Sequence, residues 1–254
     1  MKITTILLHY YSQRTQNIAR IIKDLKASSR PPDKLIIFNN NPEVTYPTGK
    51  GFTVINSDKN YGGRGRYPIA LLEPSDYYLF LDDDVSVCKN TIKNFSKYAY
   101  DGCCNGYWGK IVNPKARQCY VTGREIYGKS ISEPKEVDLL VGEALLFVSF
   151  SAFKNIFKTE EMLLKENYIF GREEDLITSM SNRPFVIPAK ADEYYTRLDT
   201  KGVGYCKTPG HFPLRNLMAK KLSPIRRQAD SIPIPDKLKI KTENKTKENS
   251  YKPI

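Results

Sequence analysis

The chain has 254 residues, of which 40% are hydrophobic and 27% are charged, and its net charge is +12 at pH 7. This composition is typical of a folded soluble chain, and 15 Gly and 16 Pro exclude a collagen-like or wholly disordered one. No apolar run approaches the roughly 20 residues that a membrane span requires, so we expect a soluble, cytoplasmic protein. The length can form one large domain or two small ones.

The first 81 residues alternate between short apolar runs and helical patterns. Apolar residues three and four positions apart predict a helix around residues 18–25, and a second helix is expected over 64–72. The predicted strands are residues 3–8, 34–38, 52–55 and 77–81. Strands and helices in this order predict an α/β fold with a largely parallel, doubly wound sheet.

The pattern changes after about residue 90. Helices are expected over 91–100 and 151–165, and the segment 102–122 is rich in Gly, aromatic and β-forming residues. Residues 137–150 are strongly apolar, and 183–188 read as a short strand between prolines. Beyond about residue 222 the chain is rich in Pro and Lys with almost no aromatic residues, so a packed core is expected to end there. We therefore predict one domain over 1–223, with halves 1–100 and 101–223, and a basic, extended or disordered tail over 224–254.

The positive charge is concentrated in that tail. The last 35 residues hold ten Lys and Arg against four Asp and Glu, which is half of the net charge of the chain. A basic tail suits a polyanionic partner such as DNA or an anionic membrane surface, and it is equally typical of a solvated terminus. Five cysteines without CxxC spacing argue against a disulfide framework or a zinc knuckle. With two histidines in the chain, a metal site must rely on carboxylates.

Three successive carboxylates, Asp82, Asp83 and Asp84, follow the apolar strand at 77–81. Because like charges repel, a fold that gathers three of them at a strand end usually supplies a cation. Asp82 and Asp84 would point the same way if the strand continued, and their oxygens suit a divalent metal. The alternative is a polar turn that caps the next helix, which needs one Asp rather than three. The pattern favours a metal site.

Three further segments could carry chemistry. Glu173, Glu174 and Asp175 open an apolar segment, which suits either a helix N-terminus or a general base that faces the first cluster. His211 lies in a Gly/Pro loop, where it is either a structural residue or a ligand. The glycine-rich turn at 60–66 could cradle a phosphate, which Arg64 or Arg66 could pair with.

The order of these motifs resembles that of nucleotide-sugar glycosyltransferases of the GT-A type, close to family 2. Asp82–Asp84 resembles the family's DxD motif, Glu174–Asp175 its ED motif, and residues 141–147 its acceptor-side segment. The likeness covers about residues 3–215. The QxxRW segment of processive polysaccharide synthases is missing, which favours transfer of a single sugar. The resemblance implies a Rossmann-like, mostly parallel sheet with helices on both faces.

The resemblance also implies roles for individual residues. Asp84, with Asp82 and a late ligand His211, would bind Mn²⁺ or Mg²⁺, and Asp175, with Glu174 as the rival, would be the general base of an inverting reaction. Tyr11, Asn39, Arg66, Asp82 and Asp83 would bind the nucleotide sugar, most simply a UDP-sugar. The residues that would contact the acceptor are Tyr107, Trp108 and Glu143.

Three alternatives stay open at this point. The acceptor could be a hydroxymethylated base in DNA, which the net charge of +12 and the basic tail favour. A nucleotidyltransferase would also use paired carboxylates and Mg²⁺, but the loop at 9–14 lacks the glycine expected after the first strand. A non-catalytic nucleotide-binding module would not need the combination of Asp82, Asp84, Asp175 and His211.

Overall fold

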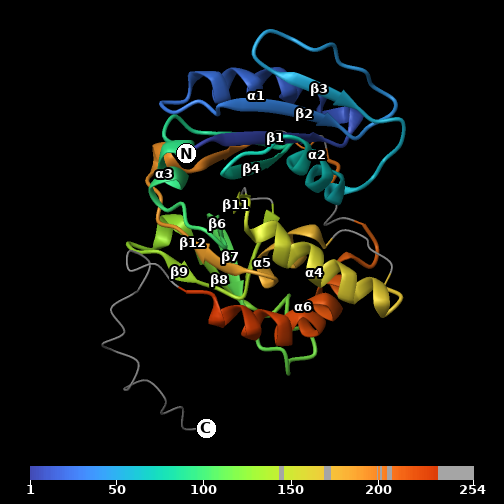
Figure 1. The fold of residues 1–254 in the computed structure, drawn as a ribbon, viewed down its shortest axis with the longest axis vertical. Coiled ribbons are helices and arrows are strands. Elements are labelled where there is room, and N and C mark those ends of the chain that lie inside the picture. The colour runs from blue at the N-terminus through green and yellow to red at the C-terminus, as the bar shows by residue number, and fades with distance from the viewer. Residues whose placement is uncertain (143–145, 169–172, 199, 201, 205–207, 234–254) are drawn as a thin grey trace.

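A computed structural model describes residues 1–142, 146–168, 173–198, 200, 202–204 and 208–233. Its centre is an eight-stranded sheet with the strand order β3-β2-β1-β4-β11-β6-β12-β9 (Figure 1). The parallel N-terminal part consists of β1 (Ile3–His9), β2 (Lys34–Asn39), β3 (Thr53–Asn56) and β4 (Tyr77–Asp82). The mixed part consists of β6 (Cys103–Gly106), β9 (Lys135–Glu136), β11 (Leu146–Ser149) and β12 (Arg183–Val186).

Helices cover both faces of this sheet because apolar side chains alternate along its strands. On β1, Ile3 and Leu7 pack towards one face, which α1 (Thr15–Ala27) and α3 (Thr91–Lys97) cover. Ile6 and Leu8 pack towards the other face. That face is covered by α2 (Arg66–Leu72), α4 (Ala152–Lys165), α5 (Glu174–Met180) and α6 (His211–Gln228). Each fully buried aliphatic or aromatic side chain contributes about 1.5–3 kcal/mol to folding.

Two small antiparallel sheets lie beside the central one. The first has the order β10-β7-β8, with β10 at Leu139–Leu140, β7 at Trp108–Ile111 and β8 at Arg124–Tyr127. The second pairs β5 (Val85–Val87) with β13 (Tyr195–Arg197), which ties the chain after β4 to a segment more than 100 residues later. Short 3₁₀ helices lie at Ser12–Arg14, Gly63–Gly65, Gly128–Ser130, Ala191–Glu193 and Ala229–Ser231.

The predicted strands and helices of the first 81 residues are present, and their ends agree to within a few residues. The C-terminal end differs from the prediction. Helix α6 continues through Pro224 to Gln228, five residues beyond the predicted limit of the domain at residue 223. Arg226 on this helix is 6% exposed and forms an ion pair with Glu136. Polar contacts of basic side chains therefore hold a segment that composition alone assigned to the tail. Residues 234–254 of the predicted tail lie outside the described residues.

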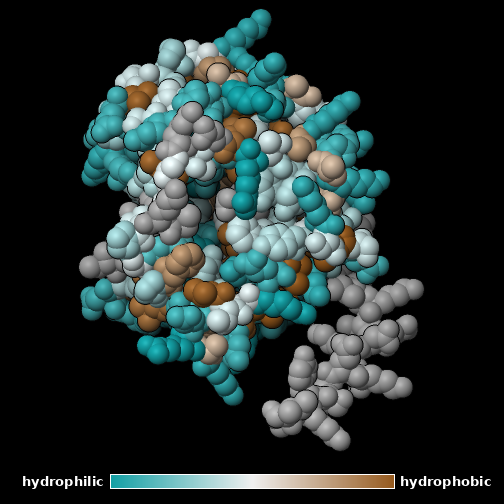
Figure 2. Space-filling model, turned by 180° about the vertical axis from the view of Figure 1, so that it is seen from behind, coloured by the Kyte–Doolittle hydropathy of each residue, from teal (hydrophilic) through white to brown (hydrophobic). Residues whose placement is uncertain are grey.

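In the described ranges, no helix is both long enough and apolar enough to cross a membrane. From behind, hydrophilic side chains cover most of the molecular face, and hydrophobic ones form separate patches (Figure 2). Leu217 on α6 and Leu164 on α4 are among the large apolar residues that are more than half exposed.

Candidate active site

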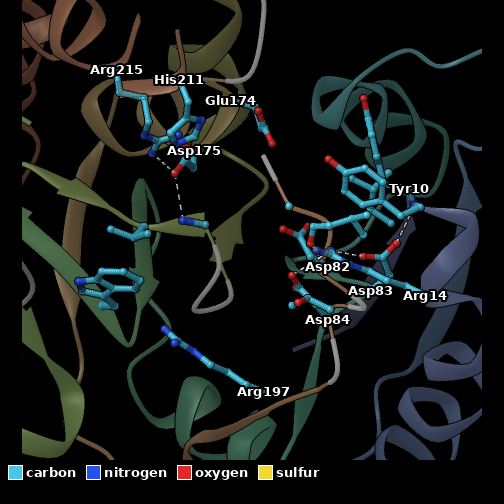
Figure 3. A pocket seen from close by; sticks show the side chains of 18 of the residues that line it. Tyr10, Arg14, Asp82, Asp83, Asp84, Glu174, Asp175, Arg197, His211 and Arg215 are labelled. Atoms are coloured by element: carbon cyan, nitrogen blue, oxygen red, sulfur yellow. Dashed lines mark hydrogen bonds and ion pairs between the residues drawn. The ribbon is translucent and has the colours of Figure 1, made fainter. Parts of the chain in front are cut away.

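A cavity of about 500 Å³ opens at the carboxyl ends of β1 and β4, where ligands bind in open α/β sheets (Figure 3). Residues from β4, from the starts of α5 and α6, and from the small sheet of β7 and β8 line it. The cavity therefore brings together residues from Leu8 to Arg215, which lie more than 200 residues apart in sequence. The predicted site residues among its lining are Tyr11, Arg66, Asp82, Asp83, Asp84, Trp108, Glu174, Asp175 and His211.

The three aspartates form a turn between two strands. Strand β4 ends at Asp82, Asp83 and Asp84 make the turn, and β5 begins at Val85. The strand does not continue through Asp84, so the alternation that would have placed Asp82 and Asp84 on one face does not apply. The three carboxylates instead differ in their partners: Asp82 pairs with Arg66, and Asp83 and Asp84 share Arg14. Arginine side chains supply the cations that the repulsion of three neighbouring acids requires.

Asp83 is the structural member of the turn. It is 1% exposed, and its Oδ2 accepts hydrogen bonds from the backbone N–H groups of Tyr10 at 2.8 Å and Tyr11 at 3.1 Å. Its Oδ1 accepts a bond of 2.7 Å from Arg14. These contacts fix the loop that follows β1 and occupy both oxygens. The position does not support the predicted contact of Asp83 with a nucleotide sugar.

Arg14 is the cation between the second and third aspartates, and it was not among the residues predicted for the site. Its Nη1 lies 2.7 Å from Asp83 Oδ1 and 2.9 Å from Asp84 Oδ2, and its Nη2 donates to the Val203 carbonyl at 2.6 Å. The guanidinium also lies 4.8 Å from the centre of the Tyr11 ring. Burial disfavours its charge, but Asp84 and Asp83 outweigh that effect and raise the pKa of Arg14.

Arg66 bridges the first aspartate and the acidic start of α5. It is 5% exposed, donates to Asp82 Oδ1 at 2.6 Å and lies 4.0 Å from Glu174 Oε1. Its Nε donates to the carbonyl of Gly63 at 3.0 Å. The predicted phosphate-binding Arg66 therefore lines the cavity as a buried guanidinium between two acids. Any contact with a phosphate would be made from that fixed position.

Glu174 packs against the glycine-rich turn. A Cβ atom on Gly63 would lie 2.0 Å from Glu174 Oε1, so this glycine makes room for the carboxylate of Glu174. Burial, together with the neighbouring Asp175, raises the pKa of Glu174 to about 7, and Arg66 opposes the shift. The turn that suggested a phosphate cradle in the sequence thus accommodates an acid that is partly protonated near neutral pH.

Asp175 is held by groups from three segments. Its Oδ2 pairs with Arg215 of α6 and accepts the Gly142 N–H at 3.0 Å, and its Oδ1 accepts the Leu176 N–H at 3.0 Å. Asp175 and Arg215 are 6% and 5% exposed. Arg172, the basic residue nearest to Asp175 in sequence, lies outside the described residues, and Arg215 supplies the positive charge from a distant segment. In Figure 3 this pair faces the aspartate turn across the cavity.

The opposite wall of the cavity is aromatic and charged. Trp108 of β7 stacks on Tyr127 with 5.5 Å between ring centres, and the Arg197 guanidinium lies 5.9 Å from the Trp108 ring. Beside them, the Lys110 ammonium pairs with Glu125 at 3.0 Å. Trp108 lines the cavity, and its predicted contact with a sugar or a base remains a prediction. Glu143, the third predicted acceptor residue, lies outside the described residues.

Two predicted site residues belong to the protein interior instead. Tyr107 is fully buried and packs between Phe95 and Tyr194, with ring centres 4.6 and 5.0 Å away. Asn39 is also fully buried, and its side chain bonds to His9 and Asn56. Neither residue lines the cavity. The positions of Tyr107 and Asn39 therefore do not support the predicted roles at the acceptor and at the nucleotide base.

The donor set for a metal is divided between the two sides of the cavity. His211 is the first residue of α6 and lies near Asp175 and Arg215, whereas Asp82 and Asp84 lie on the other side (Figure 3). Among the residues that the structure describes, no group of three His, Cys, Asp or Glu could hold a metal ion. The oxygens of Asp82 and Asp84 are of the type that Mn²⁺ and Mg²⁺ prefer, so a cation here would need further ligands from a bound diphosphate or from water.

The residues missed from the sequence include four cations. Arg14, Lys110, Arg197 and Arg215 line the cavity, and each contacts an acid, an aromatic ring or both. The signal for Arg14 was its place in the loop after the first strand, at the edge where ligands bind. Arg215 gave no local signal, because the helix that carries it begins after a Gly/Pro turn and resembles a basic tail.

Two solved structures resemble this arrangement. The chain matches Staphylococcus aureus TarS, residues 1–349 in complex with UDP-GlcNAc, with a TM-score of 0.52 and 17% identity, over 82% of this chain and 61% of that one. It matches GalNAc-T7 with UDP, GalNAc and Mn²⁺ with a TM-score of 0.53 and 9% identity, over 74% of this chain and 43% of that one. Both are GT-A glycosyltransferases. The chain has the GT-A fold.

The GT-A fold accounts for the position of the cavity at the carboxyl ends of β1 and β4 and for the helices on both faces of the sheet. This chain spans about three fifths of the TarS fragment and less than half of GalNAc-T7. No protein-family model and no curated protein matches the sequence. The structural match therefore concerns the fold, and the chemistry has to be argued from the residues of the cavity.

Proposed function

We propose that this chain is a metal-dependent glycosyltransferase that moves one sugar from a nucleotide sugar to a hydroxyl acceptor. The observation that carries the proposal is the aspartate turn, Asp82–Asp84, facing Asp175 across one cavity of a GT-A fold, with Glu174 linked to Asp82 through Arg66. The structures of TarS with UDP-GlcNAc and of GalNAc-T7 with UDP and Mn²⁺ make a UDP-sugar the first donor to test.

The donor would lie along the aspartate turn. Tyr11 offers a ring at the end of β1, and Arg66, between Asp82 and Glu174, offers a fixed positive charge. Asp84, assisted by Asp82, would hold Mn²⁺ or Mg²⁺ against the diphosphate, and His211 is the candidate for a later ligand. When bound, such a cation offsets the charge that develops on the departing nucleoside diphosphate.

We assign the general base to Asp175, with Glu174 as its rival. The base removes the proton of the acceptor hydroxyl while the oxygen forms a bond to the sugar carbon C1. The bond from C1 to the phosphate oxygen breaks, and its electron pair leaves with the nucleoside diphosphate, so the configuration at C1 is inverted. Arg215 and the Gly142 N–H hold Asp175 Oδ2, and Oδ1, which accepts the Leu176 N–H, keeps a second acceptor site for the proton.

Thermal stabilisation by donors tests the proposal directly. UDP-, GDP- and dTDP-sugars are each added with and without Mn²⁺, because a ligand that binds the folded state raises the melting temperature. We expect one nucleotide class to raise it only with Mn²⁺, and the same donor to transfer its sugar to a hydroxyl acceptor. No stabilisation by any nucleotide would argue against a glycosyltransferase.

One observation favours a polyanionic acceptor such as DNA. A second groove of about 380 Å³ lies along α6 and contains Arg117 and Lys220. It begins at Pro213, next to Phe212 of the main cavity, and the segments 113–124 and 208–229 on either side of it contain no acidic residue. A phosphodiester chain could follow this groove while its hydroxyl group enters the cavity.

Salt dependence separates this acceptor class from a neutral glycan. Binding of a hydroxymethylated oligonucleotide should weaken steeply with salt, and R117Q together with K220Q should flatten that dependence by about two ion equivalents. An oligosaccharide acceptor should show neither effect. Binding that is insensitive to both salt and the two substitutions would exclude the polyanionic acceptor.

A further inference from the structure

We propose that Arg14 is an internal counter-ion that makes divalent-cation binding at Asp84 depend on a bound nucleoside diphosphate. The inference rests on the proposed function, because it concerns the cation and the donor of that reaction. It assigns Arg14 a positioning role: the guanidinium regulates what Asp84 can bind, and it need not touch the reacting atoms.

Arg14 places its positive charge next to Asp84 Oδ2, the oxygen that a divalent cation would need as a ligand. Arg14 Nη1 contacts Asp84 Oδ2 at 2.9 Å and Asp83 Oδ1 at 2.7 Å, and the Arg14 side chain is 5% exposed. The side chain of Asp84 is 16% exposed, so it still reaches the cavity. In surroundings with little water, this attraction is stronger than that of a surface pair.

Arg14 cannot readily turn away when a cation arrives. Its Nη2 donates to the Val203 carbonyl at 2.6 Å, and the Tyr11 ring lies against the guanidinium. Its partner Asp83 is fixed by the N–H groups of Tyr10 and Tyr11, and Asn17 donates to the Asp83 carbonyl at 2.9 Å. The positive charge is thus anchored from several directions and remains beside Asp84.

This anchoring has a thermodynamic consequence. A divalent cation that arrives without nucleotide meets a carboxylate whose charge Arg14 already offsets in part, and the two cations repel each other. A diphosphate brings negative charge that attracts both, so the nucleotide should strengthen cation binding. Coupling of two binding equilibria is reciprocal, and the cation should therefore strengthen nucleotide binding by the same factor.

The test measures Mn²⁺ binding to the full chain by calorimetry, with and without UDP. In the wild type we expect weak Mn²⁺ binding alone and a large gain with UDP. Removing only Arg14 would leave Asp83 as a buried unpaired charge, so the informative variant is R14M/D83N, in which the amide oxygen at position 83 can still accept the Tyr10 and Tyr11 N–H bonds. In this variant Mn²⁺ alone should bind about tenfold tighter, and the gain from UDP should fall by a similar factor.

Two further variants keep the test decisive. R14K retains the charge and should keep the weak Mn²⁺ binding of the wild type. R20M removes a charge from the surface pair of Arg20 with Asp24 on the same helix and should leave the Mn²⁺ affinity unchanged. If folded R14M/D83N binds Mn²⁺ alone no tighter than the wild type, the role of Arg14 is refuted while the glycosyltransferase proposal stands. If the wild type binds no UDP even with Mn²⁺, both proposals fail.

Discussion

The two sides of the cavity carry different charge. The side formed by the aspartate turn and Glu174 sets four acids against two arginines, Arg14 and Arg66. The side formed by α5, α6, β7 and β8 matches Asp175 with Arg215 and Glu125 with Lys110, and it adds Arg197.

This difference indicates how the cavity can hold a donor. A diphosphate placed beside an excess of carboxylates is repelled unless a further cation accompanies it. The other side needs no added positive charge, because its two acids are paired with cations and Arg197 adds a further one. The unequal distribution therefore supports the proposed metal site on the aspartate side and the proposed acceptor site on the other side.

Substitution of Asp84, the third aspartate, should lower activity more than any other change. D84N should lower kcat/KM by at least about three orders of magnitude, because several kcal/mol of charge stabilisation are lost with the cation. Chelation with EDTA should abolish transfer, and Mn²⁺ should restore it. H211A, on the other side of the cavity, should lose less, since carboxylate and diphosphate oxygens remain. A fully active, folded D84N would end the metal hypothesis.

Substitution of Asp175, the proposed base, should have the next largest effect on activity. D175N keeps the shape of the side chain but cannot take the proton, so turnover should fall by about two to four orders of magnitude with nearly unchanged donor binding. The pH profile decides between the two acids. If Glu174 were the base, the rate would fall as the pH drops below about 7, where that carboxyl becomes protonated. Wild-type activity in D175N combined with loss in E174Q would transfer the role to Glu174.

The raised pKa of Glu174 should also cost stability. In the unfolded chain this carboxyl loses its proton near its ordinary pKa of 4.5, and in the folded chain only near 7. The stability that Glu174 contributes is therefore present below pH 4.5 and is lost as the pH rises towards 7. E174Q should melt higher than the wild type at pH 7.5, and the difference should shrink towards pH 4.5. Equal melting temperatures at both pH values would show that the environment does not hold the proton.

The smallest effects are expected for Trp108 on β7 and for Tyr107, which precedes it, and they should differ in kind. W108A should raise the acceptor KM by about tenfold through the loss of a stacking face, with donor binding unchanged. Y107F should leave both kinetic constants intact and cost about 1 kcal/mol of stability, because the buried hydroxyl bonds to Thr91 and Asn94 are lost. A changed acceptor KM in Y107F would show that Tyr107 contributes to acceptor binding.

The predictable part of the molecule is the part built from local patterns. Strands β1, β2 and β4 are continuous apolar runs, and the period of α1 is visible in its isoleucines, so these elements could be predicted from single segments. The aspartate turn follows because acids after a buried strand must lie at its carboxyl end. The same reasoning placed Tyr11 at the cavity, whereas Arg66 was predicted from the glycine-rich turn and from the resemblance to the family.

The remaining part depends on partners that are distant in sequence. Strands β8, β9 and β13 are two to four residues long and form only by pairing with strands elsewhere. Helix α6 carries Lys, Arg and Pro224, and its polar surroundings hide the apolar side that packs on α5. Tyr107 and Trp108 are adjacent aromatic residues, and only the tertiary structure shows that one is core and the other lines the cavity.

The position of Arg215 has a consequence for the order of assembly during synthesis. Every other described element that lines the cavity precedes α6 in the chain, and α6 supplies the guanidinium that pairs with Asp175. A nascent chain that has not yet released α6 from the ribosome holds Asp175 without its partner, next to the empty place of that helix. The cavity is therefore finished only when α6 docks, and a partly synthesised chain should fold the aspartate side of the cavity before it could carry out the proposed reaction.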